Sequence, residues 1–217
     1  MLDVLFQNPI SFLIFAVLLL VVVTVHEFSH ALAADRLGDP TPGLKGRLSL
    51  NPLAHLDPIG TLLFIIAGFG WGKPVPFDPF NLKHPKKDSA IISFAGPASN
   101  IALAVLAALI FRFMIATPYF SFPLWSADLM TSFIRLNILL AVFNLIPVHP
   151  LDGFRVVAGL LPQKYYHDWL YLERYGMIFL IFLIFPFFGR APVFTVISPV
   201  IEFFMSILIP SQLGGII

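Results

Sequence analysis

The sequence predicts an all-α polytopic membrane protein, with five or six transmembrane helices and a small re-entrant or β-like element after the first helix. Two observations lead to this fold class. Of the 217 residues, 58% are hydrophobic and only 12% are charged, whereas soluble domains average about 45–50% and about 25%. The apolar residues also gather into runs long enough to cross a hydrocarbon core of about 30 Å.

Five apolar segments reach or approach the roughly 20 residues that a membrane-crossing helix needs. In chain order they cover Pro9–Ala34, Ala90–Ala116, Leu129–Ile146, Tyr171–Phe188 and Val193–Ile209. Because proline interrupts helical hydrogen bonding, Pro186 is expected to bend or end the fourth helix. The first segment has neither the basic start nor the small-residue cleavage site of a secretory signal peptide, so it is expected to remain as a helix.

The region between the first two predicted helices carries shorter elements. The run Ile59–Trp71 has thirteen residues and three glycines, which favours a re-entrant segment over a full crossing. The piece Lys45–Leu50 alternates weakly and is predicted to form a short strand. Lysine and arginine concentrate in residues 35–88, and cytoplasmic loops carry this excess. If the short run does not cross, the N-terminus lies outside and the C-terminus inside.

No soluble domain separates from the apolar runs. A single membrane-embedded domain over residues 1–217 is therefore expected, with a catalytic core of about 9–160 and accessory helices at about 170–210. The net charge of +1 gives no indication of nucleic acid as a partner. The chain contains no cysteine, so disulfides and iron–sulfur clusters are excluded, and any zinc site must use histidine and carboxylate. The sequence does not indicate an oligomeric state.

The first predicted helix ends in H-E-F-S-H, which places His26 and His30 four residues apart with Glu27 beside the first. Residues at this spacing share one helix face, so two imidazoles can bind one zinc ion while the glutamate activates a water. A lone H-E-x-x-H pattern also arises by chance, and the alternative is a polar cluster at the helix end. An ionisable residue within a bilayer is costly, which favours the functional interpretation.

A zinc site with two histidines needs a third protein ligand. The third predicted helix ends in N-L-I-P-V-H-P-L-D-G, where the prolines are expected to stop the helix and leave Asp152 in a turn. Both motif-bearing helices are predicted to run from outside to inside, so Asp152 can approach His26 and His30. The alternative is an ordinary helix-end residue. His149 is expected to be a turn residue, with contact to the site as the alternative.

Together these motifs resemble the site-2 protease family of intramembrane metalloproteases. H-E-F-S-H, then A-G-P-A-S-N at residues 95–100, then N-L-I-P-V-H-P-L-D-G occur in the family's order, and the resemblance covers roughly Thr24 to Gly153. It implies a zinc metalloendopeptidase of the cell membrane, acting in regulated intramembrane proteolysis. Its partners would be the lipid bilayer and transmembrane protein substrates, cleaved in or near their membrane segments by metal-activated water.

Carried over to this chain, the resemblance implies one Zn²⁺ bound by His26, His30 and Asp152, with Glu27 as general base. Asn144 would act in catalysis as a donor near the substrate carbonyl, and Asn100 would bind substrate. For both asparagines the alternative is a hydrogen bond between helices, because a buried amide needs a partner.

Several remaining residues of the motifs and apolar runs have structural interpretations. Gly96 and Pro97 are expected to serve close helix packing and helix entry. Arg135 and Glu202 lie within apolar runs, where a charged side chain pairs with another or reaches toward the membrane surface.

Two other function classes fit part of the pattern. A zinc-binding or ion-transporting membrane protein should carry several intramembrane acidic or histidine sites in succession, whereas the sequence shows one cluster. A pseudo-protease that binds membrane partners without cutting them does not need Glu27. A Glu27→Gln variant separates these alternatives, since only a protease loses cleavage while keeping zinc.

Overall fold

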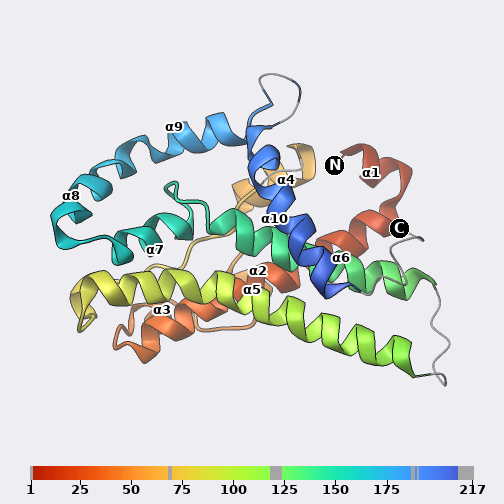
Figure 1. Cartoon of the computed structure of the whole chain (residues 1–217), viewed down its shortest axis with the longest axis horizontal. Coiled ribbons are helices and arrows are strands. Elements are labelled where there is room, and N and C mark those ends of the chain that lie inside the picture. The colour runs from red at the N-terminus through yellow and green to blue at the C-terminus, as the bar shows by residue number, and fades with distance from the viewer. Residues whose placement is uncertain (1, 68–69, 118–123, 187–188, 190, 210–217) are drawn as a thin grey trace. The chain divides into compact units, whose positions relative to one another are not determined.

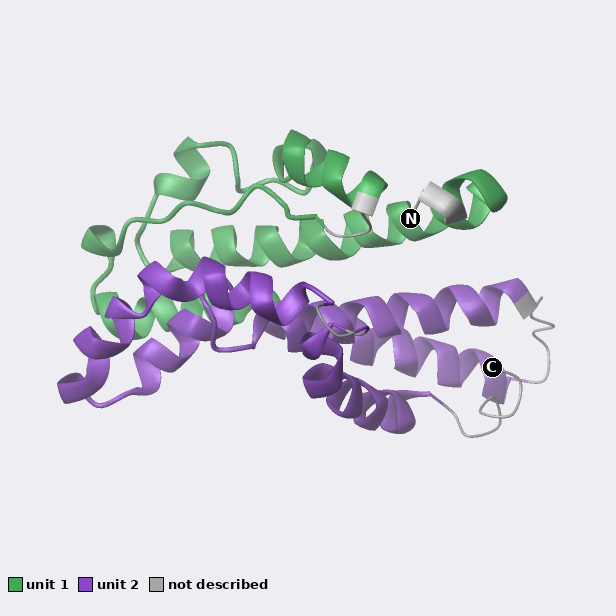
Figure 2. Ribbon diagram, turned by 90° about the horizontal axis from the view of Figure 1, so that it is seen from above, with its two compact units in different colours: residues 1–96 green, residues 97–217 purple. Residues whose placement is uncertain are grey.

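The computed structural model describes residues 2–67, 70–117, 124–186, 189 and 191–209, which form helices joined by loops and contain no β-strand (Figure 1). It divides into two compact units, Met1–Gly96 and Pro97–Ile217 (Figure 2), and the single predicted domain stays a prediction. The α-helices are α1 Leu2–Gln7, α2 Pro9–Arg36, α3 Thr41–Leu44, α4 Pro58–Ala67, α5 Pro85–Ala116, α6 Leu124–Asn144, α7 Asp152–Leu160, α8 Gln163–Tyr171, α9 Glu173–Ile184 and α10 Pro192–Leu208. Two 3₁₀ turns are η1 Pro52–Ala54 and η2 Pro79–Asn81.

Three of the described helices are long and apolar enough to cross a membrane. They are α2 with 28 residues, α5 with 32 and α6 over Trp125–Asn144 with 20. The last two predicted spans also form helices, but α9 has 12 residues and α10 has 17, so the count of five or six crossings is not confirmed. Helix α4 has 10 residues and rises about 15 Å, half the hydrocarbon thickness, as expected for a segment that does not cross.

Helix α2 has a defined beginning and end. The Asn8 side chain accepts a hydrogen bond from the Ser11 amide at 3.1 Å, and Pro9 takes the first helical position, where its missing N–H costs nothing. At the other end Gly38 has φ +104°. The Gly38 amide donates to Asp35 and the Asp39 amide donates to Ala34, which is a Schellman motif. These caps fix the length of the helix that carries the H-E-x-x-H residues.

The strand predicted at Lys45–Leu50 is absent, so this prediction is wrong. Lys45 caps the C-terminus of α3, and Gly46 follows with φ +67° in a left-handed turn. Arg47 is then buried and its guanidinium donates to the Ala54 carbonyl. Weak alternation could not reveal a glycine turn and a buried arginine, and these residues form a folded loop instead. An isolated antiparallel bridge joins Leu56 and Gly72.

A buried carboxylate joins the two loops of the first unit. Asp39 is fully buried; its Oδ1 accepts from the Thr41 amide at 3.0 Å, the Thr41 hydroxyl at 2.6 Å and the Asn81 side chain at 2.8 Å. Its Oδ2 accepts from the Asp78 amide at 2.7 Å. Burial acts to raise the pKa of this carboxyl, but the hydrogen bonds outweigh it and lower the pKa below its ordinary value. The loop after α2 is thereby tied to the loop before α5.

The second unit has an apolar core formed by α6, α10 and the part of α5 that follows Pro97. Alanines on α5 face isoleucines of α6 and α10; the buried members are Ala104, Ala107, Ala108, Phe111, Ile134, Ile138, Ala191, Val193, Ile197, Ile201, Met205 and Leu208. Small residues on one helix allow close approach of the others. Helix α9 ends at Ile184 before Pro186, as predicted.

Candidate metal centre

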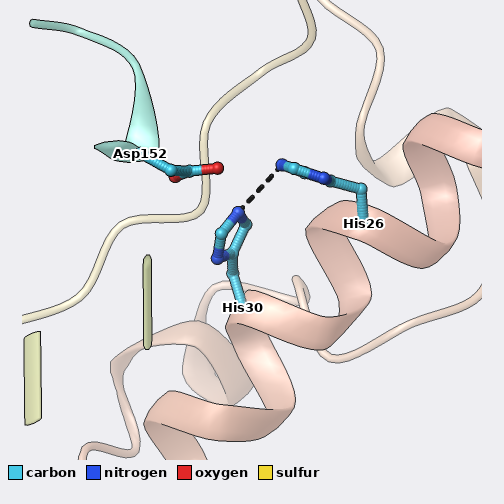
Figure 3. A group of neighbouring side chains, drawn as sticks. All are labelled: His26, His30 and Asp152. Atoms are coloured by element: carbon cyan, nitrogen blue, oxygen red, sulfur yellow. Dashed lines mark hydrogen bonds between the residues drawn. The ribbon is translucent and has the colours of Figure 1, made fainter. Parts of the chain in front are cut away.

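His26 and His30 lie on the buried face of α2, one helical turn apart. The side chains are 4% and 8% exposed, and their Nε2 atoms are 3.0 Å apart with the rings edge to face (Figure 3). Ring nitrogens that converge from two imidazoles are what a shared metal ion needs, and this pair is shielded from solvent.

The orientation of His30 is set by a backbone group from α5. Its Nδ1 is 2.7 Å from the Ile92 carbonyl oxygen, which can only accept a hydrogen bond, so Nδ1 carries the proton. Nε2 therefore presents a lone pair toward His26. Metal-binding histidines generally donate their second ring N–H to such an acceptor. The sequence analysis missed Ile92, and since only its backbone takes part, the residue type gives no signal.

Gly96 forms the wall against which both imidazoles pack. A Cβ at this position would lie 2.3 Å from His30 Nε2 and 2.7 Å from His26 Cε1. The expectation that Gly96 serves close packing is confirmed, and its neighbours are the candidate ligands themselves.

Pro97 does not serve helix entry, because it lies inside α5, which begins at Pro85. The residues before the A-G-P-A-S-N motif form a polar segment in the sequence, so the helix was expected to begin at Ala90. In the structure α5 already begins at Pro85, where the Asp88 side chain accepts a hydrogen bond from the His84 amide at 2.7 Å.

Glu27 follows the first histidine and is partly buried. Among the described residues no donor hydrogen-bonds its carboxylate. Gly72 approaches it closely, since a Cβ on that glycine would lie 3.8 Å from Glu27 Oε1. A carboxylate next in sequence to one of the paired imidazoles, without a donor among the described residues, is suited to accept a proton from water.

Asp152 lies in the second unit and is the first residue of α7, not a turn residue as predicted (Figure 3). The prolines do end the preceding helix, since α6 stops at Asn144. A Cβ on Gly153 would lie 2.2 Å from the Leu145 carbonyl oxygen, so glycine lets α7 start directly against the end of α6. A carboxylate in the first turn of a helix is also favoured by the helix dipole.

The two candidate asparagines make hydrogen bonds within the second unit. Asn144 Nδ2 donates to the Leu140 carbonyl of its own helix at 3.0 Å. Asn100 Nδ2 donates to Asn137 Oδ1 at 3.1 Å, and both residues are fully buried. Asn137, which the sequence analysis did not single out, also donates to the Phe133 carbonyl. The roles of Asn144 in catalysis and of Asn100 in substrate binding stay predictions.

His149 contacts the start of α9. Its Nδ1 is 3.5 Å from Glu173 Oε1, and a Cβ on Gly176 would lie 2.5 Å from the His149 Cβ. Burial lowers the pKa of His149; the Glu173 carboxylate acts to raise it, and Arg155 acts to lower it further. Since its pKa falls below the ordinary value of about 6.5, the imidazole is neutral at pH 7. His149 lies in a turn, as predicted.

Three apolar helices long enough to cross a membrane and the buried H-E-x-x-H pair indicate a zinc metalloprotease. Comparison with known proteins gives the same class. The chain is 39% identical over 183 residues to "Putative zinc metalloprotease YwhC" of Bacillus subtilis, covering 82% of this chain and 84% of that protein. The chain therefore belongs to the zinc metalloprotease family of YwhC.

More distant relatives carry similar names. The chain is 30% identical over 171 residues to "Putative zinc metalloprotease Rip2" of Mycobacterium tuberculosis strain H37Rv, covering 76% of this chain and 63% of that protein. It is 25% identical over 159 residues to "Zinc metalloprotease MJ0392" of Methanocaldococcus jannaschii, covering 73% of this chain and 38% of that protein. The chain thus spans less than two thirds of these two longer relatives. No family model and no solved structure matches the chain.

Proposed function

We propose that this protein is a site-2-protease-like zinc endopeptidase of the cell membrane, which cleaves peptide bonds in or near transmembrane segments of membrane proteins. The observation that carries the proposal is the buried pair of Nε2 atoms 3.0 Å apart on an apolar helix of 28 residues. One imidazole is oriented by the Ile92 carbonyl, and a glutamate follows the other. This donor set fits zinc, which prefers imidazole and carboxylate ligands in tetrahedral sites.

The third ligand in this proposal is Asp152. Two imidazoles from one helix leave a catalytic zinc site one protein ligand short, and the described chain offers a carboxylate held at a helix start by the Gly153 contact. The support is the chemistry of the ligand set and the order of the three sequence motifs.

A zinc ion bound to these residues would supply a Lewis acid for the scissile carbonyl and lower the pKa of a bound water to about 7. Glu27 takes the proton from the attacking water and delivers it to the leaving amine. Asn144 stands at the end of α6 and has one amide N–H beyond the bond to Leu140, which it can donate toward the developing oxyanion. Asn100 would contribute to substrate binding.

A transmembrane substrate is expected to unwind before cleavage. Its carbonyl groups are hydrogen-bonded inside its own helix, so the scissile bond becomes accessible only where the helix opens. Residues such as proline and glycine lower the free energy of that opening. We therefore expect substrates with helix-breaking residues near one end of the membrane segment.

The test uses the purified full chain in detergent, with a synthetic single-span peptide that carries a Gly-Pro step near one end and a fluorophore–quencher pair. Wild type should contain one zinc per chain and cleave the peptide. Glu27→Gln should keep zinc and lose cleavage by about 10²–10⁴-fold, the usual contribution of a general base. Asp152→Asn should lower both zinc affinity and cleavage.

Glu173→Gln is the matched control, because it makes the same chemical change on an exposed glutamate at the start of α9. It should cleave like wild type. Cleavage by Glu27→Gln at the wild-type rate would contradict the role of that residue. Full zinc affinity in Asp152→Asn would remove Asp152 from the ligand set, and wild type with zinc but without cleavage would favour a zinc-binding protein.

A further inference from the structure

A cationic pocket lies in the first unit, between the loop after α3 and the loop after α4. Its volume is about 440 Å³, and it is lined by Lys45, Arg47, Lys73, Pro74 and Pro76. Three of these five residues are positively charged and none is acidic. The pocket involves none of the residues that the proposed proteolysis uses.

Arg47 is held rigidly at this pocket. Its side chain is buried, and its Nη1 donates to the carbonyl oxygens of Ala54 and Lys73, the latter at 3.3 Å. A guanidinium has five N–H donors in a planar fork, and Nη1 carries two of them. The donors on Nε and Nη2 have no acceptor among the described residues, so a preorganised set of donors is left for a ligand.

The positive charge of the pocket is not neutralised within the part of the chain that the structure describes. No described carboxylate forms an ion pair with Lys45, Arg47 or Lys73. Like charges gathered around one cavity repel each other, and a bound anion removes that repulsion. A fixed guanidinium with two mobile ammonium groups matches phosphate, which accepts paired hydrogen bonds from arginine and point charge from lysine.

The surroundings of the pocket indicate where that phosphate comes from. Leu44 immediately precedes Lys45 and is 83% exposed, and Leu50 and Leu53 on the same loop are 61% and 76% exposed. Exposed leucines interleaved with cations are typical of segments that lie at a membrane interface, where leucines enter the acyl region and cations meet anionic headgroups. The loop follows the short helix α3, which comes four residues after α2, and α2 is one of the three described helices able to cross a membrane.

We propose that this pocket binds the phosphate group of an anionic phospholipid. The lipid headgroup would occupy the space between the Arg47 fork and the two lysines, with its acyl chains beside the exposed leucines. The loop would then be fixed at the membrane surface by a specific lipid and not only by its apolar side chains.

The experiment measures binding to the purified full chain in detergent by isothermal titration calorimetry. Short-chain phosphatidylglycerol, phosphatidylcholine of the same chain length and inorganic phosphate are titrated in separate arms. Phosphatidylglycerol should bind with the highest affinity, and inorganic phosphate should bind only weakly. The Lys45→Gln/Lys73→Gln double variant should bind about 25-fold more weakly, since each lysine near anionic lipid contributes about fivefold.

The matched control is Lys83→Gln/Lys87→Gln, which removes two exposed lysines that do not line the pocket. It should change the affinity less than about twofold. Both lysines of the test variant are also exposed, so its thermal unfolding should match that of wild type. Equal losses in the two double variants, or equal binding of phosphatidylcholine, would overturn the proposal. Binding of inorganic phosphate without binding of phosphatidylglycerol would overturn the assignment to lipid.

Discussion

Gly96 and His30 are in such close contact that the imidazole fills the space of the side chain that glycine lacks. A Cβ on Gly96 would lie 2.3 Å from His30 Nε2, and Cβ atoms essentially never come within 3.0 Å of a neighbour. The same Cβ would lie 2.7 Å from His26 Cε1. The spacing of the two candidate zinc ligands therefore depends on a residue that has no side chain and is not itself a candidate ligand.

We predict that Gly96→Ala lowers zinc affinity by about 10–100-fold, the usual effect of disturbing groups that orient metal ligands. The added methyl group must displace His30, because the helix backbone of α5 cannot move as easily as a ring. Zinc content after dialysis against a competing chelator measures this. Gly43→Ala is the control, since its Cβ would meet only Asp35 Oδ1 at 4.0 Å. Wild-type zinc affinity in Gly96→Ala would contradict the packing argument.

Asp39 gives a prediction about stability. Asp39→Asn replaces an acceptor of four hydrogen bonds by an amide whose N–H₂ group faces donors. We expect a loss of about 1–3 kcal/mol in the free energy of unfolding, as for other buried groups left without their partners. Thermal unfolding in detergent measures this. Asp35→Asn changes an exposed carboxylate and should have little effect.

The same carboxylate predicts a pH dependence. The pKa of Asp39 is lower in the folded protein than its ordinary value, so the folded state disfavours its protonation. Its contribution to stability is then complete above the unfolded-state pKa of about 3.9 and is lost as the pH falls through the folded-state pKa. Unfolding of wild type and Asp39→Asn should differ near neutral pH and converge below about pH 4. A constant difference at all pH values would be inconsistent with this linkage.

The Asn100–Asn137 hydrogen bond separates two roles of Asn100. If the bond is structural, Asn100→Leu and Asn137→Leu should each lower stability by about 0.6 kcal/mol and at most about 1.7 kcal/mol, as for hydrogen bonds between membrane helices. The loss of stability in the Asn100→Leu/Asn137→Leu double variant should then be smaller than the sum of the two single losses. If Asn100 binds substrate, its variant should raise the KM for peptide cleavage while Asn137→Leu leaves KM unchanged. Unfolding and steady-state kinetics on all three variants distinguish the outcomes.

The ion pair between Arg135 and Glu202 lies at the surface of the second unit and joins α6 to α10, with side chains 53% and 62% exposed. In water such an ion pair contributes little to the free energy of unfolding. In a membrane, however, a single unpaired charge at the centre of a helix costs about 2.5–3.5 kcal/mol. We expect Glu202→Leu alone to destabilise the protein in bicelles more than Arg135→Leu/Glu202→Leu does. If the double variant instead loses the sum of the two single-variant stability losses, the pair is surrounded by water and not by lipid.

The predicted helices all exist because apolar runs of this length have few other ways to satisfy their backbone groups in a membrane. Their boundaries moved where side chains cap the ends. Helix α5 starts at Pro85 and not at Ala90, since the Asp88 carboxylate accepts the His84 amide. The prediction of a strand at Lys45–Leu50 was wrong. Arg47 is buried and donates hydrogen bonds to two backbone carbonyl groups, and the weak alternation of polar and apolar residues does not reveal this.

The part of the candidate site that could be predicted is the part formed by residues close together in the sequence. Helical spacing alone places His26 and His30 on one face, and the structure confirms that their ring nitrogens converge. The Ile92 carbonyl and the tight fit at Gly96 could not be predicted, because both depend on how α5 approaches α2. The ligand role of Asp152 stays a prediction, supported by the order of motifs.

Orientation of His30 by a main-chain oxygen has a consequence for mutagenesis. Every amino acid at position 92 supplies the same backbone carbonyl. Substituting the side chain at this position therefore does not remove the hydrogen bond that orients the His30 imidazole. An amide-to-ester replacement that weakens this acceptor, introduced by chemical synthesis or nonsense suppression, would reach it. Tolerance of substitutions at Ile92 therefore says nothing about whether its backbone is needed.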